Sequence, residues 1–280
     1  MVDESAARTP VASGRAGLVA AISLFTALPI PARAHPQVDE QLAARALRWL
    51  PVIGVLVGLP ASVALAATTA RLVDTAGALL GATVAVAVLA VVTRAFHLDG
   101  LADTVDGLGG AATKERALAV MRQPDIGAFG VVALVLVLGL KVAGLAAIAV
   151  DHPALAAYTL VLSEVTGRSG VVLAAGPGVP SARSEGFGAL VAGTASRAAR
   201  WLAVAFPVAL AVLPAAWTFA SVLSAWDVVR LVAGVLVGLG VAVVWRRHVV
   251  RRIGGVTGDV FGSIVELGSV ATVLAVAVWG

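Results

Sequence analysis

Apolar residues are grouped in long stretches along this chain, and polar segments separate the stretches. A helix needs about 20 residues to cross the roughly 30 Å hydrocarbon core of a bilayer. Stretches of this length predict about seven membrane-spanning helices, at 50–70, 76–96, 127–150, 154–175, 201–219, 229–245 and 261–279. No fixed period repeats along the chain, so the pattern predicts a helical bundle and not a repeat array.

A further apolar stretch at 17–31 is short and ends in the sequence LPIP. Its length of about fifteen residues falls below the span of a bilayer. We therefore expect a short interfacial or re-entrant helix before the first span, and its length alone leaves open whether it crosses.

Composition agrees with a membrane protein. Of the 280 residues, 60% are hydrophobic and 13% are charged, and the mean hydropathy is +0.99. These values exclude an ordinary soluble domain of this length. We expect an all-α, polytopic integral membrane bundle that forms a single domain over 1–280, because no connection between spans is long enough for a soluble domain.

Charge and cysteine content narrow the chemistry. The chain has no cysteine, so any metal site must use oxygen or imidazole ligands. The net charge of +4 gives no reason to expect nucleic-acid binding. Basic residues gather in the connections 97–126, 176–200 and 246–260. By the positive-inside rule these connections face the cytoplasm.

The first candidate site lies directly after the second apolar stretch. Asp99, Asp103 and Asp106 are spaced i, i+4 and i+7, so a helix would place them on one face. Three adjacent carboxylates repel one another unless a cation lies between them. Mg²⁺ prefers oxygen ligands and often binds substrate phosphates, which points to phosphoryl chemistry. The alternative is that Asp99 caps a helix and the other two acids solvate its exposed end.

A second pair of acids lies at the last span. Asp259 and Glu266 are seven residues apart, so they share one face of the helix that enters the membrane there. We expect both carboxylates to be metal ligands and the two acid-bearing helices to build one site. The alternative for Asp259 is a helix cap.

Three more charges lie within predicted spans. Glu164 and Arg168 form an i, i+4 pair, which is either functional or a neutralised structural pair. Lys141 has no partner nearby in the sequence. We therefore expect Lys141 to contact an anionic ligand or the acidic cluster.

Several of these motifs resemble the cobalamin synthase family, the adenosylcobinamide-GDP ribazoletransferases. The resemblance rests on HLDGLADT at 97–104 with Asp106-Gly107, on Gly254-Gly255, on TGD at 257–259 and on the early LPIP. It extends over nearly the whole chain, with the same order of spans. One departure is Gln123, where the family usually has an aspartate after a Met-Arg pair.

The resemblance implies a reaction and its partners. The enzyme would join adenosylcobinamide-GDP to alpha-ribazole or its 5′-phosphate, release GMP and require Mg²⁺, at a site on the cytoplasmic face of the bacterial cell membrane. Its partners would be these substrates and the lipid bilayer. A homo-oligomer is possible, since Gly234 and Gly238 allow close helix packing within or between chains.

This reaction assigns roles to the charged residues. The expected metal ligands are Asp99, Asp103, Asp106, Asp259 and Glu266. Asp99 or Asp103 would accept the hydroxyl proton. His97 is either a second candidate base or a residue that packs the site, since it lies off their shared helical face. The expected substrate-binding residues are Lys114, Arg116, Arg122, Lys141, Arg168 and Arg183, the first three as clamps on the GDP phosphates.

Two other functions fit parts of the pattern. A CDP-alcohol-type phosphotransferase also places paired aspartates at a helix end, but its second aspartate follows two residues after the first, which differs from the spacing here. An ion-coupled transporter would use charges within the membrane. That class is expected to show internal repeats and broken helices in matching halves, which this chain does not show.

Overall fold

The chain forms a bundle of helices. The structure is a computed structural model, and it describes residues 14–29, 38–216 and 223–279. The helices in this part of the chain are α1 (Gly14–Phe25), α2 (Glu40–Arg71), α3 (Thr75–Val92), α4 (Phe96–Gly110), α5 (Lys114–Val120), α6 (Ala128–Asp151), α7 (Pro153–Ala174), α8 (Phe187–Val191), α9 (Arg197–Ala216), α10 (Ala225–Ile253) and α11 (Gly258–Val278).

The predicted class of fold is confirmed. Six of the described helices are long and apolar enough to cross a membrane: α2, α3, α6, α9, α10 and α11. The predicted span 154–175 forms α7, which is outside this set of six. The short N-terminal helix is present as α1, although 30–31 of its predicted range lie outside the described residues, as do 217–219 of the predicted span 201–219.

Helix α7 lies at the centre of the bundle. Every residue from 162 to 172 is buried, and α7 packs against α2, α6, α9, α10 and α11. A helix surrounded by other helices meets protein instead of lipid, so it tolerates more polar residues than a lipid-facing span. This position explains why α7 carries a glutamate and an arginine within its length.

The end of α3 differs from the prediction. The second span was expected to continue to 96, but α3 ends at Val92. Arg94 and Ala95 both have φ of 54°, in the left-handed region that non-glycine residues rarely adopt. The chain therefore changes direction, and α4 begins as a separate helix at Phe96. The acidic cluster lies on this separate helix, which is not one of the candidate spans.

The basic segment 246–260, which was expected to be a loop, is helical over its first half. Helix α10 continues to Ile253, so the arginines from 246 to 252 belong to its last turns. Gly254 ends the helix with φ of 82°, a conformation that glycine adopts without steric cost. Cationic side chains at a helix C-terminus are favoured by the helix dipole.

Glycine allows the central helices to approach closely. A Cβ at Gly54 of α2 would lie 2.6 Å from Val165 Cα of α7, and a Cβ at Gly167 of α7 would run into the Val265 carbonyl of α11. Gly234 and Gly238 of α10 pack on Thr272 of α11, within the same chain. Dispersion at such short backbone distances is a main source of helix association in membranes.

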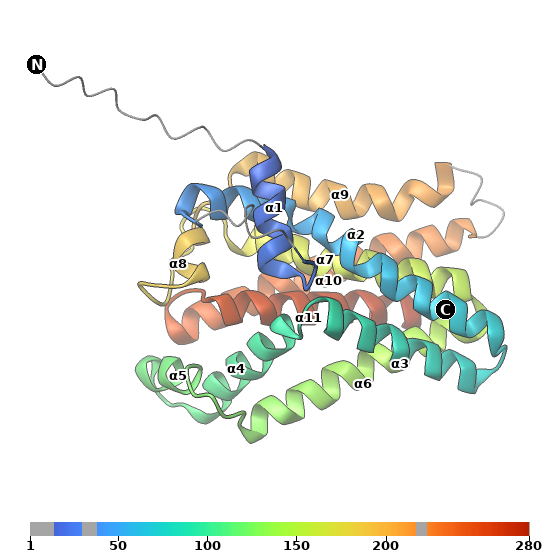
Figure 1. Cartoon of the computed structure of the whole chain (residues 1–280), viewed down its shortest axis with the longest axis horizontal. Coiled ribbons are helices and arrows are strands. Elements are labelled where there is room, and N and C mark those ends of the chain that lie inside the picture. The colour runs from blue at the N-terminus through green and yellow to red at the C-terminus, as the bar shows by residue number, and fades with distance from the viewer. Residues whose placement is uncertain (1–13, 30–37, 217–222, 280) are drawn as a thin grey trace, which may run out of the picture.

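The connections gather at one end of the molecule. Helices α4, α5 and α8 lie together at the left in Figure 1, where α11 begins and where the first turns of α2 and α9 also lie. Direct contact supports this arrangement, because Gly188 of α8 packs on the backbone of Thr257, just before α11. We call this the α4 end of the bundle.

The glycine contact at the centre gives a first prediction. Gly167→Ala should destabilise the protein by about 1–3 kcal/mol, since the added methyl group overpacks a backbone contact. The matched control is Gly139→Ala in α6, where a Cβ would meet no atom within 4 Å and where alanine is favoured in a helix by about 0.5–1 kcal/mol. Thermal unfolding in detergent, followed by tryptophan fluorescence, checks this. Equal midpoints for the two variants would contradict the packing described here.

Candidate functional site

Two acid-bearing helices meet at the α4 end. A Cβ at Gly100 of α4 would lie 2.7 Å from Asp259 O of α11, and a Cβ at Gly262 of α11 would lie 3.1 Å from His97 O of α4. Helix backbones can come this close only where one partner lacks a side chain. The two glycines therefore bring Asp259 beside the acidic face of α4, as the sequence predicted for two distant helices.

The carboxylates on these helices affect one another. Asp99 is exposed, and Asp103 is partly buried one turn further into α4. Desolvation and the negative charges of Asp99, Asp259 and Asp106 together raise the pKa of Asp103 to about 6. The guanidinium of Arg183 acts in the opposite direction. Asp103 thus lies where several carboxylates converge with few opposing charges.

Arg183 is held against this cluster. Its Nη1 donates to Asp259 Oδ2 at 3.1 Å, and its Nη2 donates to the Met121 carbonyl at 3.4 Å. The segment before Arg183 is paired with the α10–α11 connection, because Ala182 N donates to Val256 O and Val256 N donates to Pro180 O. The predicted anion-binding arginine and the predicted metal ligand Asp259 are therefore neighbours.

Asp259 does not cap the last span. The N-cap of α11 is Thr257, whose hydroxyl oxygen accepts a hydrogen bond from Val260 N at 3.2 Å. The Thr257 hydroxyl also contacts Asp259 Oδ2 at 3.2 Å. The alternative that Asp259 is only a cap is therefore wrong, and its carboxylate faces Arg183 and the α4 cluster.

Asp106 has a different role from the one predicted. It is buried, and its two oxygens accept hydrogen bonds from Gly127 N at 2.7 Å and Gly130 N at 2.8 Å. Both amides belong to the N-terminus of α6, whose N-cap Gly127 offers no side chain for capping. A Cβ at either glycine would collide with this carboxylate. Asp106 thus caps α6 from another helix, and we correct its assignment as a metal ligand.

Lys141, Arg168 and Glu266 lie in a separate buried ion network. Lys141 Nζ donates to Glu164 Oε1 at 2.7 Å and lies 3.6 Å from Glu266 Oε2. Arg168 Nη1 donates to Glu164 Oε2 at 2.6 Å. These four charges come from α6, α7 and α11 and sum to zero. Lys141 was expected to contact an anionic ligand or the acidic cluster, but it pairs with Glu164 and Glu266. Glu164 with Arg168 forms the neutralised pair that the sequence left as an alternative.

The structure therefore corrects three further assignments. Lys141, Arg168 and Glu266 were expected to bind substrate or metal, but their ionic partners are one another and Glu164. Within the bundle an unpaired charge is costly, so mutual pairing is the stable arrangement. Their role in this structure is to join three helices.

The predicted phosphate clamps are exposed at the same end. Lys114 and Arg116 lie on α5, and Arg122 follows it. None of these three takes part in an ion pair within the described residues, so their charges are free to meet an anion. Sequence reasoning missed Arg252, whose Nη2 donates to Leu108 O at 3.1 Å and Ala111 O at 3.3 Å. That contact fixes the end of α10 to the end of α4.

His97 is buried beside the acidic cluster. Its ring stacks on Phe25 with centroids 6.4 Å apart, and Phe96 lies edge-on to it. Burial, together with the positive charges of Arg168 and Lys141, lowers the pKa of His97 to about 3, against the opposing effect of Glu164. The imidazole is therefore neutral and weakly basic at pH 7, which favours the packing role of His97 over a role as general base.

The acidic face is not a complete metal cage by itself. In the described ranges, no three histidine or acidic side chains are arranged to hold a metal ion together. Asp99, Asp103 and Asp259 nevertheless supply hard oxygen donors from two adjoining helices. Mg²⁺ commonly takes one or two carboxylates from the protein and its other ligands from water and substrate phosphates. The donor set fits that mode of binding.

Fold and site together define a polytopic membrane protein with a carboxylate and arginine cluster at one end of its bundle. The family model described as cobalamin-5-phosphate synthase matches residues 17–277. The chain belongs to this family, which confirms the resemblance seen in its motifs. No solved structure matches it.

Curated relatives agree over almost their whole length. Three proteins named adenosylcobinamide-GDP ribazoletransferase are similar to the chain. The Frankia casuarinae protein is 39% identical and covers 92% of each chain. The Bradyrhizobium diazoefficiens protein is 39% identical over 94% of this chain and 93% of its own. The Nocardioides protein is 38% identical over 91% of this chain and 95% of its own.

The buried ion network gives a second prediction. Lys141→Met should destabilise the protein by about 3–5 kcal/mol, because two buried glutamates then share one arginine. Adding Glu266→Gln should recover part of this loss, since the remaining Glu164 and Arg168 charges balance. The midpoint of thermal unfolding is measured for both single variants and the double variant. If the two losses simply add, the network is not one electrostatic unit.

Proposed function

We propose that this protein transfers the cobinamide-phosphate part of adenosylcobinamide-GDP to alpha-ribazole or its 5′-phosphate, with release of GMP. The observation that carries the proposal is the match to named ribazoletransferases over more than nine-tenths of the chain. That family membership favours this reaction over the CDP-alcohol-type phosphotransferase and the ion-coupled transporter.

The reaction exchanges one phosphorus–oxygen bond for another. A ribazole hydroxyl oxygen attacks the phosphorus that carries cobinamide, and the bond from that phosphorus to the bridging pyrophosphate oxygen breaks. GMP leaves with the bridging oxygen, and the hydroxyl proton passes to a base. Negative charge increases on the leaving phosphate, so cations must be placed around it.

The residues at the α4 end can meet these demands. Lys114, Arg116 and Arg122 are exposed cations that would bind the phosphates of the GDP moiety. Arg183 donates a hydrogen bond to Asp259. In the complex it would hold a nonbridging phosphate oxygen. Asp99 or Asp103, through a carboxylate oxygen that does not bind the metal, would accept the hydroxyl proton.

The carboxylates also offer a place for the expected metal. Asp99, Asp103 and Asp259 would hold Mg²⁺, which when bound neutralises pyrophosphate charge and stabilises the leaving group. Asp103 lies near Asp259 and Asp99, whose charges raise its pKa, so a bound cation would relieve this repulsion. The ion pair between Arg183 and Asp259 would rearrange as substrate enters.

Location follows from the distribution of charge. The α4 end carries the exposed bases of α5 and the arginines at the end of α10. We propose that this end faces the cytoplasm, where the positive-inside rule places such residues, and that the membrane is the bacterial cytoplasmic membrane. The pyrophosphate substrate would then reach the site without crossing the bilayer.

The reaction gives a third prediction. Purified protein in detergent should form GMP from adenosylcobinamide-GDP only when ribazole or its phosphate and Mg²⁺ are both present. Asp103→Asn and Asp259→Asn should each reduce the rate on the order of 10³-fold, as expected for about 4 kcal/mol of lost charge stabilisation. Chromatographic separation of GMP and of the corrinoid product measures both halves of the reaction.

The control is Asp151→Asn, an exposed acid at the far end of α6, which should retain the wild-type rate. Release of GMP without ribazole would indicate a hydrolase instead of a transferase. Wild-type rates in folded Asp103→Asn or Asp259→Asn protein would remove these carboxylates from the site.

A further inference from the structure

A groove between α2 and α9 is separate from the carboxylate cluster. Its volume is about 430 Å³. One wall comes from the third and fourth turns of α2 and the other from the first three turns of α9. The lining residues are Arg48, Trp49, Pro51, Val52, Ser196, Ala198, Ala199, Leu202, Ala203 and Phe206.

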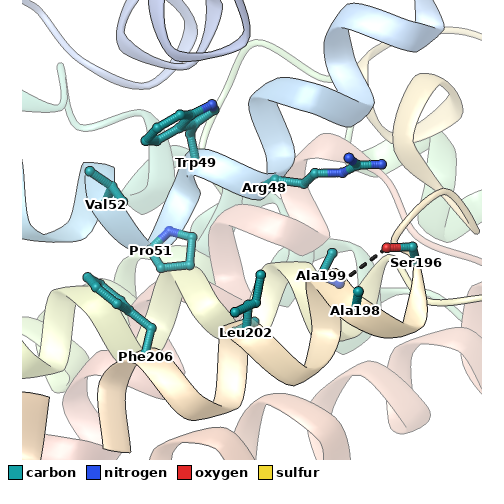
Figure 2. A pocket seen from close by; sticks show the side chains of 10 residues that line it. Arg48, Trp49, Pro51, Val52, Ser196, Ala198, Ala199, Leu202 and Phe206 are labelled. Atoms are coloured by element: carbon teal, nitrogen blue, oxygen red, sulfur yellow. Dashed lines mark hydrogen bonds between the residues drawn. The ribbon is translucent and has the colours of Figure 1, made fainter. Parts of the chain in front are cut away.

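The groove is polar at one end and apolar along the rest. Figure 2 shows Arg48 and Ser196 together at one end, while Pro51, Val52 and Phe206 lie toward the other. The Ser196 hydroxyl accepts a hydrogen bond from Ala199 N at 3.2 Å, so it already caps the first turn of α9. Arg48 supplies the charged group of the groove.

The apolar part of the groove opens toward lipid. Both walls belong to candidate membrane spans, and Leu202 and Val52 have 68% and 37% of their surfaces exposed. Going from Arg48 to Val52 and from Ser196 to Phe206, both walls run from the α4 end into the apolar part of the bundle. Trp49, beside Arg48, is the residue type that concentrates at membrane interfaces.

The charge at the polar end has no ion-pair partner in the part of the chain that the structure describes. Arg48 is exposed, and none of the five ion pairs in the described ranges includes it. An unpaired guanidinium at the level of the lipid headgroups attracts phosphate, with which it forms paired hydrogen bonds.

We propose that this groove is a binding site for one anionic phospholipid. The headgroup phosphate lies on the Arg48 guanidinium beside Trp49. One acyl chain lies in the groove, against Leu202, Ala203 and Phe206. The lipid fills the space between α2 and α9, two helices that the chain itself leaves apart along this face. A single cation followed by an apolar channel is complementary to a phospholipid and matches neither a free phosphate ion nor a nucleotide.

Native mass spectrometry of the purified protein tests this site. Phosphatidylglycerol and phosphatidylcholine with identical acyl chains are added in equal amounts, and the retained lipid is counted. The wild-type protein should retain one phosphatidylglycerol in preference. Arg48→Gln should reduce that preference about five-fold, the effect of one arginine near a membrane surface, whereas Arg48→Lys should largely preserve it. Ala198→Trp, which fills the groove from an exposed position, should reduce retention of both lipids.

The control is Arg251→Gln, an exposed arginine at the same end of the bundle that does not line the groove. It should leave the lipid preference unchanged. Equal retention of the two lipids by the wild-type protein would overturn the proposal, as would an unchanged preference in Arg48→Gln. Displacement of the lipid by inorganic phosphate would indicate an anion site instead, and a lipid-free dimer broken by Ala198→Trp would assign the groove to a second copy of the chain.

Discussion

The contact between α4 and α11 is the constraint on which the site depends. Gly100 lies against the backbone of Asp259, and Gly262 lies against the backbone of His97. A side chain at either glycine would push the helices apart, and the carboxylates of α4 would then be separated from Asp259. Burial and the nearby carboxylates together raise the pKa of Asp103, and a cation bound between the carboxylates would relieve their repulsion. The proposed metal binding therefore depends on the close approach of the α4 and α11 backbones.

Two other interactions keep the acidic helices in place. Asp106 caps α6 from α4, and the network around Glu164 ties α11 to α6 and α7. Both involve buried charged groups whose hydrogen bonds are directional. They therefore fix the rotation of a helix about its axis as well as its distance from neighbouring helices. Such groups add little net stability when paired, but breaking the pair is costly. They act at a distance from the reacting atoms, by holding the helices that carry them.

Sequence reasoning predicted the spans and the joint use of two distant helices, because the thickness of a bilayer and the helical repeat impose patterns that one chain shows. It did not predict which charged side chains pair with one another. Lys141 and Glu164 are 23 residues apart, and nothing in the local sequence pairs them. Asp106 has the sequence spacing expected of a metal ligand. Its actual role, capping α6, is seen only when the unpaired backbone amides at the start of that helix are placed beside it. Two glycines there, at 127 and 130, were the available signal. No comparable signal in the sequence marks the break between α3 and α4, since Arg94 and Ala95 are not residues that favour a left-handed backbone conformation.

Binding of Mn²⁺ in place of Mg²⁺ tests directly whether α4 and α11 share one metal site. Free Mn²⁺ is followed by electron paramagnetic resonance with adenosylcobinamide-GDP present. Asp103→Asn and Asp259→Asn should each weaken binding by about ten-fold or more, and the double variant should lose less than the two effects combined, because the residues act as one unit. Wild-type Mn²⁺ affinity in Asp259→Asn, or strictly additive losses in the double variant, would contradict the shared site.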